Sequence, residues 1–141
     1  MIYNEVKRDL FTVPDNEYTY VHCIASDLGM GAGIAVPMNA KYELRSRIRY
    51  LNVPLHYPTC IYTEPVFNLI TKPYSSGKPT LSTLTLSVQQ MKDMMEAKGI
   101  KKLAMPTIGC GLDRLSWDKV SDMLKIQFHD TDVEILVCIY P

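Results

Sequence analysis

Two glycine-rich segments carry the residue types that hold phosphate groups. They read SDLGMGAGIAV and PTIGCGLDRLSW, and each stands between a strand-like run and a helix-like run. Because glycine has no side chain, backbone N–H groups can approach an anion there, and the N-terminus of the following helix adds a favourable dipole. Either loop alone is also the usual composition of a tight turn. Two such loops at one crevice predict a site for a diphosphate, as in a dinucleotide-like ligand.

Neither glycine segment matches a common nucleotide-binding motif. The first ends its G-x-G-x-G run at Gly33, but the third glycine of a dinucleotide fingerprint is due at position 34, which is Ile34. Gly77-Lys78 is similar to the end of a Walker loop, but the earlier glycine is replaced by Lys72. The sequence therefore argues against a Rossmann dinucleotide fold and against a nucleoside triphosphatase.

The elements that position these loops alternate between strands and helices. We expect strands at about Ile2–Val6, Tyr18–Ile24, Cys60–Thr63, Val66–Thr71, Lys101–Met105 and Val133–Tyr140. We expect helices after an N-cap at Thr80 as far as Lys98, after Ser116 as far as Phe128, and from Ile34 to Leu51 with a break allowed. The alternation predicts a three-layer α/β/α domain with a mixed sheet of roughly six strands.

Composition places the chain among globular proteins. Its 141 residues suit a single domain over 1–141, and 47% apolar residues are enough for a core. Fifteen basic and fifteen acidic residues leave no net charge to attract nucleic acid or an anionic membrane. No apolar run approaches the ~20 residues that span a bilayer, and MIYNEVKRDLF lacks the apolar stretch of a signal peptide. We expect a cytoplasmic monomer without a membrane partner.

Metal chemistry is not indicated by the cysteines and histidines. The four cysteines are far apart, and no Cys/His set has the spacing of zinc ligands. Cys23 and Cys138 lie in apolar runs and are expected to be buried, and the three histidines are scattered. We predict neither a metal nor a cofactor.

The segments GMGAGIAV, LITK and MPTIGCGLDRLSW occur in this order and together resemble the macrodomain family. The likeness covers almost the whole chain. It is greatest to the branch with the terminal ADP-ribose protein glycohydrolase and the antitoxin macrodomains that reverse DNA ADP-ribosylation. The resemblance implies a hydrolase that binds ADP-ribose and removes it from a protein carboxylate or a DNA base. Two alternatives stay open: a phosphatase of ADP-ribose 1″-phosphate and a non-catalytic ADP-ribose reader.

The resemblance also implies site residues. The family's catalytic lysine and aspartate fall on Lys72 in LITK and on Asp113 in GCGLD. The opening VKRDLF places Asp9 where the family has an aspartate that hydrogen-bonds the adenine amine, although Arg8 stands where glycine is common. The implied ADP-ribose-binding set is Asp9, Leu10, Gly31, Ala32, Gly33, Ile34, Thr107, Ile108, Gly109, Cys110, Gly111 and Leu112.

The implied reaction is attack by the Lys72 amine on the anomeric carbon of the distal ribose, with a covalent intermediate. An ordinary lysine is protonated at neutral pH, so attack requires burial or a cationic neighbour that frees the amine. A nearby Asp113 favours the charged amine, and we expect it to shuttle a proton or hold the ribose hydroxyls. The segment PYSSGKPT after Lys72 is predicted to form a mobile flap.

One short basic cluster is the single feature that suggests a nucleic-acid partner. Lys41, Arg45, Arg47 and Arg49 stand against one acid, Glu43. Such a run is usually a solvated helix face, and the alternative is a contact with the phosphate backbone of ADP-ribosylated DNA.

Overall fold

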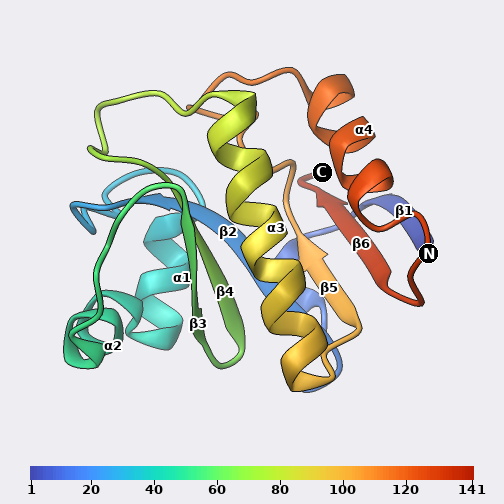
Figure 1. Ribbon diagram of the computed structural model, residues 1–141, viewed down its shortest axis with the longest axis horizontal. Coiled ribbons are helices and arrows are strands. Elements are labelled where there is room, and N and C mark those ends of the chain that lie inside the picture. Colours follow the sequence, from blue (N-terminus) through green and yellow to red (C-terminus); the bar gives the residue numbers. More distant parts are fainter.

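The structure is a computed structural model that describes residues 1–141 (Figure 1). Its elements in chain order are β1 (Ile2–Lys7), the 3-10 helix η1 (Leu10–Thr12), β2 (Thr19–Ala25), α1 (Ala35–Tyr42), α2 (Leu44–Leu51), β3 (Thr59–Thr63), β4 (Val66–Lys72), α3 (Leu81–Lys98), β5 (Lys102–Met105), α4 (Trp117–Gln127) and β6 (Glu134–Ile139). All six predicted strands are present, each within one residue of its predicted ends. None of the helices combines the length and apolar character that a bilayer crossing needs.

The six strands form one mixed sheet in the order β1-β6-β5-β2-β4-β3. Every neighbouring pair is parallel except β3 and β4, which are antiparallel and are joined by a turn at Glu64-Pro65. The carboxyl ends of the five parallel strands therefore meet at one edge of the sheet, the upper edge in Figure 1. In open α/β sheets this edge is where ligands bind.

Side chains alternate between two apolar cores, one on each face of the sheet. On β5, Leu103 and Met105 belong to the core under α3 and α4, whereas Ala104 between them belongs to the core under α1 and α2. Figure 1 shows α3 and α4 in front of the sheet and α1 and α2 behind it. The predicted three-layer α/β/α architecture is confirmed.

Helix α3 begins and ends where the sequence predicts. Thr80 Oγ1 accepts from the backbone N–H of Thr83, and Thr83 Oγ1 accepts from that of Thr80, which makes a reciprocal capping box. Gly99 ends the helix at φ 69°, a conformation that glycine adopts without strain. The capping box fixes the end of the segment 73–79, which runs from Lys72 into α3.

The helix predicted over residues 34–51 is two helices. Glu43 stands between α1 and α2 in the left-handed conformation, at φ 53°, and the Asn39 side chain accepts from Arg45 N beside the break. The break turns α2 so that the Arg45 side chain reaches the loop between β2 and α1. Two details of the fold were not predicted: Ser116 precedes α4 without a side-chain capping bond, and η1 follows β1.

A polar group of side chains is buried in the core under α1 and α2. His22 Nε2 lies 2.7 Å from Asn68 Oδ1, and the Asn68 amide donates to Thr63 Oγ1 and to the Ile61 carbonyl. Burial lowers the pKa of His22 to about 4, so the imidazole is neutral at physiological pH. His22 is a core histidine.

Candidate active site

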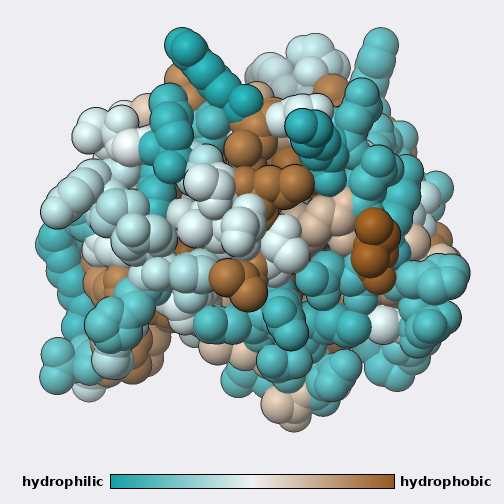
Figure 2. Space-filling model, turned by 45° about the horizontal axis from the view of Figure 1, so that its top comes forward, coloured by the Kyte–Doolittle hydropathy of each residue, from teal (hydrophilic) through white to brown (hydrophobic).

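A cleft of about 260 Å³ opens at the carboxyl ends of β2, β4 and β5. Figure 2 brings this end of the molecule forward and shows apolar surface at its centre with polar side chains around it. The residues that line the cleft are Cys23, Ile24, Ala25, Met30, Gly31, Ala32, Gly33, Ile34, Ala35, Lys72, Ser75, Lys78, Pro106, Thr107, Ile108, Gly109, Gly111, Leu112 and Asp113. Both glycine-rich segments contribute to it, as the sequence predicts.

The first glycine loop, residues 27–34, connects β2 to α1 along one wall of the cleft. Arg45 on α2 holds this loop from outside: its guanidinium donates to the Leu28 carbonyl at 2.7 Å and to the Gly29 carbonyl. Gly33 stands at φ +61°, and a side chain there would contact Leu112 of the opposite wall. The two walls are therefore in close approach at Gly33, and the exposed backbone between them is accessible to an anion.

The second glycine loop, residues 106–115, connects β5 to α4 along the other wall. Ile108 and Gly109 are buried, and a Cβ on Gly109 would lie 3.0 Å from Leu115 and 3.2 Å from Leu84. Gly109 stands at φ +74°, and its carbonyl accepts from Leu115 N at 2.7 Å. This loop is fixed by the core beneath it.

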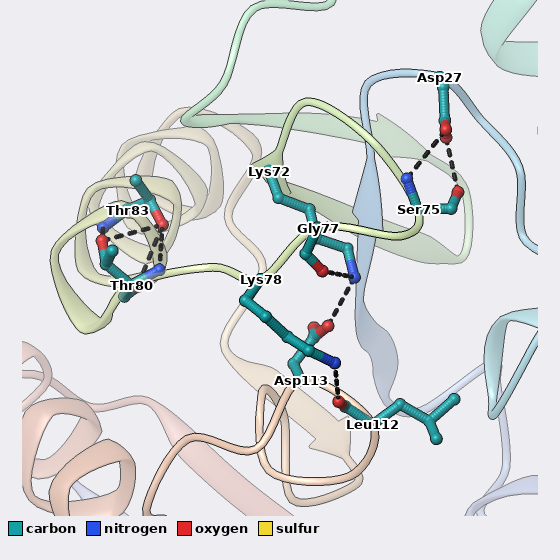
Figure 3. Close-up of polar contacts among 9 residues, drawn as sticks. All are labelled: Asp27, Lys72, Ser75, Gly77, Lys78, Thr80, Thr83, Leu112 and Asp113. Atoms are coloured by element: carbon teal, nitrogen blue, oxygen red, sulfur yellow. Dashed lines mark hydrogen bonds and ion pairs between the residues drawn. The ribbon is translucent and has the colours of Figure 1, made fainter.

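Lys72 and Asp113 meet at one end of the cleft. Lys72 Nζ lies 2.6 Å from Asp113 Oδ1 and also donates to the Gly77 carbonyl at 3.1 Å (Figure 3). The two side chains are only 11% and 14% exposed, so the pair is largely shielded from water. The Asp113 carboxylate stabilises the Lys72 ammonium and is also the nearest acceptor for its proton.

A strap over residues 73–79 passes beside this pair. Ser75 donates from its backbone N–H and its hydroxyl to the two oxygens of Asp27, at 2.8 Å and 2.6 Å. Lys78 Nζ donates to the Leu112 carbonyl at 2.6 Å, next to Asp113 (Figure 3). The strap lies within the segment predicted as a mobile flap, residues 73–80, and in this structure it is attached to both walls of the cleft.

The cysteines offer no competing nucleophile at the cleft. Burial raises the pKa of the Cys23 thiol, and it raises the pKa of Cys110 to about 11. Both thiols are therefore protonated at neutral pH, and a thiol is a far weaker nucleophile than a thiolate.

Comparison with known proteins assigns the family. No family model matches the chain. The ADP-ribose glycohydrolase OARD1 of Homo sapiens is 39% identical over 137 residues, which cover 94% of this chain and 88% of that protein; its Bos taurus counterpart matches equally. The chain is a macrodomain of the ADP-ribose glycohydrolase branch. This membership makes the macrodomain a hydrolase.

Solved structures agree with the macrodomain fold. The macrodomain of Mycobacterium tuberculosis DarG superposes with a TM-score of 0.84 at 19% identity, covering 99% of this chain and 98% of that one. Thermosipho africanus DarTG in complex with ADP-ribose gives 0.80 at 14% identity, covering 98% of this chain and 41% of that one. At such identities the likeness concerns the fold.

The macrodomain brings most of the predicted site residues together. Lys72, Asp113, Gly31, Ala32, Gly33, Ile34, Thr107, Ile108, Gly109, Gly111 and Leu112 all line the cleft. Asp9, Leu10 and Cys110 do not. Asp9 caps η1 by accepting from Phe11 N at 3.0 Å, Leu10 is 3% exposed in the core, and Cys110 Sγ donates to the Ile108 carbonyl. The assignment of Asp9 to adenine stays a prediction.

Sequence reasoning missed the polar residues that surround the reactive pair. Ser75 and Lys78 line the cleft, and Asp27 holds Ser75, yet the sequence suggested only a mobile flap there. A serine or a lysine in a polar loop has no pattern that separates it from solvated neighbours, so only tertiary contacts identify these three. The end of β2 could have been found, because Cys23, Ile24 and Ala25 directly precede the first glycine loop.

The basic cluster is not a set of four free cations. Arg45 is bound to the first glycine loop, and Arg47 donates to the Tyr42 carbonyl at 3.2 Å and to the Glu64 carbonyl at 2.9 Å. Lys41 and Arg49 remain exposed. Two of the four side chains thus bind the protein's own backbone.

Proposed function

We propose that this macrodomain binds ADP-ribose and removes it from a modified target, with Lys72 as the nucleophile and Asp113 as the proton acceptor. The observation that carries the proposal is the 2.6 Å contact between Lys72 Nζ and Asp113 Oδ1 at the end of a cleft with two glycine-rich walls. Two similar proteins support the proposal. A relative that matches most of the chain is an ADP-ribose glycohydrolase, and a protein of the same fold was solved in complex with ADP-ribose.

We orient the ligand by the positions of the two glycine loops and of the Lys72–Asp113 pair. The diphosphate lies between the two glycine loops, where backbone N–H groups are free of side chains. The distal ribose then points to the end that holds Lys72 and Asp113. The adenine extends to the side of the sheet where β1 ends, and Asp9 accepts from its amine.

The reaction consists of two substitutions at the anomeric carbon C1″, first by the lysine nitrogen and then by water. Asp113 takes a proton from the Lys72 ammonium, and the free amine attacks C1″ as the bond from C1″ to the target oxygen or nitrogen breaks. The proton that the attacking nitrogen loses passes to the departing group. Asp113 then returns its proton to the nitrogen on C1″, and water displaces that nitrogen and gives a proton to the Asp113 carboxylate. This yields free ADP-ribose, and return of the proton from Asp113 to Lys72 restores the ammonium and the carboxylate.

An ADP-ribosylated protein carboxylate is the better target than a DNA base. A carboxylate leaves readily, whereas recognition of DNA needs cations that neutralise phosphates. The macrodomain has no net charge, and Arg45 and Arg47 are bound to its own carbonyls. Lys41 and Arg49 alone supply little attraction for a strand.

A panel of ADP-ribose conjugates tests the function. The purified protein is incubated with ADP-ribose linked through a protein carboxylate, a nucleobase, an acetyl ester or a 1″-phosphate, and released products are weighed by mass spectrometry. We expect free ADP-ribose from the carboxylate conjugate, and calorimetry should show binding of ADP-ribose. Release from the 1″-phosphate alone would make the protein a phosphatase. Binding without release from any conjugate would make it a reader.

A further inference from the structure

Asp27 in the first glycine loop uses both carboxylate oxygens on its surroundings. Oδ2 accepts from the backbone N–H of Ser75 at 2.8 Å, and Oδ1 accepts from the Ser75 hydroxyl at 2.6 Å and from Gly29 N at 2.9 Å. These bonds, the Ser75 hydroxyl first, lower the pKa of Asp27, so the carboxylate is charged at neutral pH. The Asp27 side chain therefore joins the strap to the first wall of the cleft, beside the backbone bond from Asp27 N to the Pro73 carbonyl at 3.2 Å.

The strap carries this attachment to the reactive lysine. Gly77 N donates to the Tyr74 carbonyl at 2.9 Å, so residues 74–77 form a closed turn with Ser75 inside it. The carbonyl of Gly77 accepts from Lys72 Nζ. Asp27 is thus connected to Lys72 through Ser75 and the turn, as Figure 3 displays, although no direct hydrogen bond joins the two side chains.

We propose that Asp27 is a positioning residue for Lys72: it holds the strap so that the Gly77 carbonyl fixes the lysine amine between itself and Asp113. This inference rests on the proposed function, because it assumes that Lys72 attacks the substrate. Without the strap, Lys72 Nζ keeps Asp113 as its one partner and can rotate about that contact. A reacting atom displaced by about 1 Å lowers the rate by about 100-fold.

The close approach of Ser75 to the first glycine loop also leaves no room for a side chain at position 29. A Cβ on Gly29 would collide with Ser75 Oγ and would lie 3.1 Å from Ser75 Cβ. The strap packs against the first glycine loop at this point, so a side chain there would push Ser75 away from Asp27. The Gly29→Ala variant therefore provides an independent way to detach the strap without altering a charged group.

Replacement of Asp27 by asparagine separates positioning from binding. The amide oxygen of Asn can still accept from Gly29 N and from the Ser75 hydroxyl, so the variant keeps both contacts of Oδ1 and loses only the contact of Oδ2. The amide nitrogen can only donate, and it faces the N–H of Ser75, which also donates. We expect Asp27→Asn to lower kcat about 10- to 100-fold while KM and the Kd for ADP-ribose change less than about threefold. Gly29→Ala should lower kcat in the same range.

Two controls exclude a general structural effect. Asp93→Asn changes an exposed acid on α3 and should leave kcat, KM and Kd unchanged. The melting temperature of Asp27→Asn should fall by less than about 4 °C. In a Ser75→Ala background, Asp27→Asn should lower kcat by at least the same factor as in the wild type, because alanine removes the hydroxyl bond to Oδ1 and asparagine then removes the remaining backbone bond to Oδ2.

Comparison of Lys72→Ala with Asp27→Asn distinguishes failure of this inference from failure of the proposed function. If Lys72→Ala is inactive and Asp27→Asn has wild-type kcat, Asp27 does not position the lysine. If Asp27→Asn loses kcat, binding and thermal stability together, its role is structural and the inference is also wrong. If Lys72→Ala remains active, the nucleophile has been misassigned and the proposed function fails first.

Discussion

The two glycine loops reach the same cleft but are held in different ways. The first loop buries Leu28 and Met30 in the core under α1 and α2, and charged side chains, Asp27 at its start and Arg45 from α2, hold its backbone. In the second loop the backbone itself is buried, with Gly109 packed against Leu84 and Leu115. The second loop thus depends on the close packing around Gly109, whereas the first also depends on hydrogen bonds to charged side chains.

Gly109→Ala should have the largest effect on stability, because it adds a side chain to the buried part of the second loop. Alanine at φ +74° is strained, and its Cβ would crowd Leu115 at 3.0 Å and Leu84 at 3.2 Å. We expect the free energy of unfolding to fall by about 2–3 kcal/mol, measured by urea denaturation. The control is Gly111→Ala in the same loop, where a Cβ meets nothing within 4 Å. Equal losses in the two variants would mean that the second loop is not fixed by burial.

Arg45→Met should have an intermediate effect, because it releases the first loop and leaves the core intact. The variant removes the donors to the Leu28 and Gly29 carbonyls, and we expect about 1–2 kcal/mol of lost stability. Hydrogen exchange of the amides in residues 28–31 should accelerate, while exchange at Gly109 should not. Arg49→Met, an exposed arginine on the same helix, is the control. If amides of both loops accelerate together, the loops are one unit and the comparison fails.

Acidification should have the smallest effect, and it also acts on the first loop. The folded pKa of Asp27 lies below its ordinary value of 3.8, so the carboxylate contributes stability above that value and loses it as the pH falls through the folded pKa. Since Asp27 is exposed, the contribution is less than about 1 kcal/mol. Wild type and Asp27→Asn, compared by urea denaturation from pH 7 to pH 2.5, should converge at the acid end. A difference that persists there would not come from the charge of Asp27.

Most of the fold was accessible from the sequence because local signals agree with tertiary structure. Thr80 and Gly99 mark the two ends of α3, because their capping bonds involve residues only a few positions away. Val66–Thr71 is apolar throughout, which is typical of a strand buried on both faces. The sequence allows a break in the helix over residues 34–51 but does not place it at Glu43, because a glutamate in the left-handed conformation has no sequence signature. The short helix η1 was missed, since its two backbone hydrogen bonds and the cap accepted by Asp9 lie within residues 9–13, too short a stretch for a helical period.

The candidate site was predicted where the backbone determines it and missed where side chains do. The glycine loops and Lys72 lie at strand ends, and the order of strands brings these ends together. Arg45 was grouped with a solvated or DNA-binding face, because charge spacing along a helix does not reveal which carbonyl a flexible side chain reaches. The contact between Asp27 and Ser75 spans 48 residues and exists only in the folded chain.

Turnover and binding by Lys72→Ala test the central claim most directly. The variant removes the attacking amine and keeps both glycine loops, which bind the diphosphate. We expect release of ADP-ribose from a carboxylate-linked protein to fall below detection, while the calorimetric Kd for ADP-ribose changes less than about threefold. Release at the wild-type rate by Lys72→Ala, with binding intact, would contradict the account.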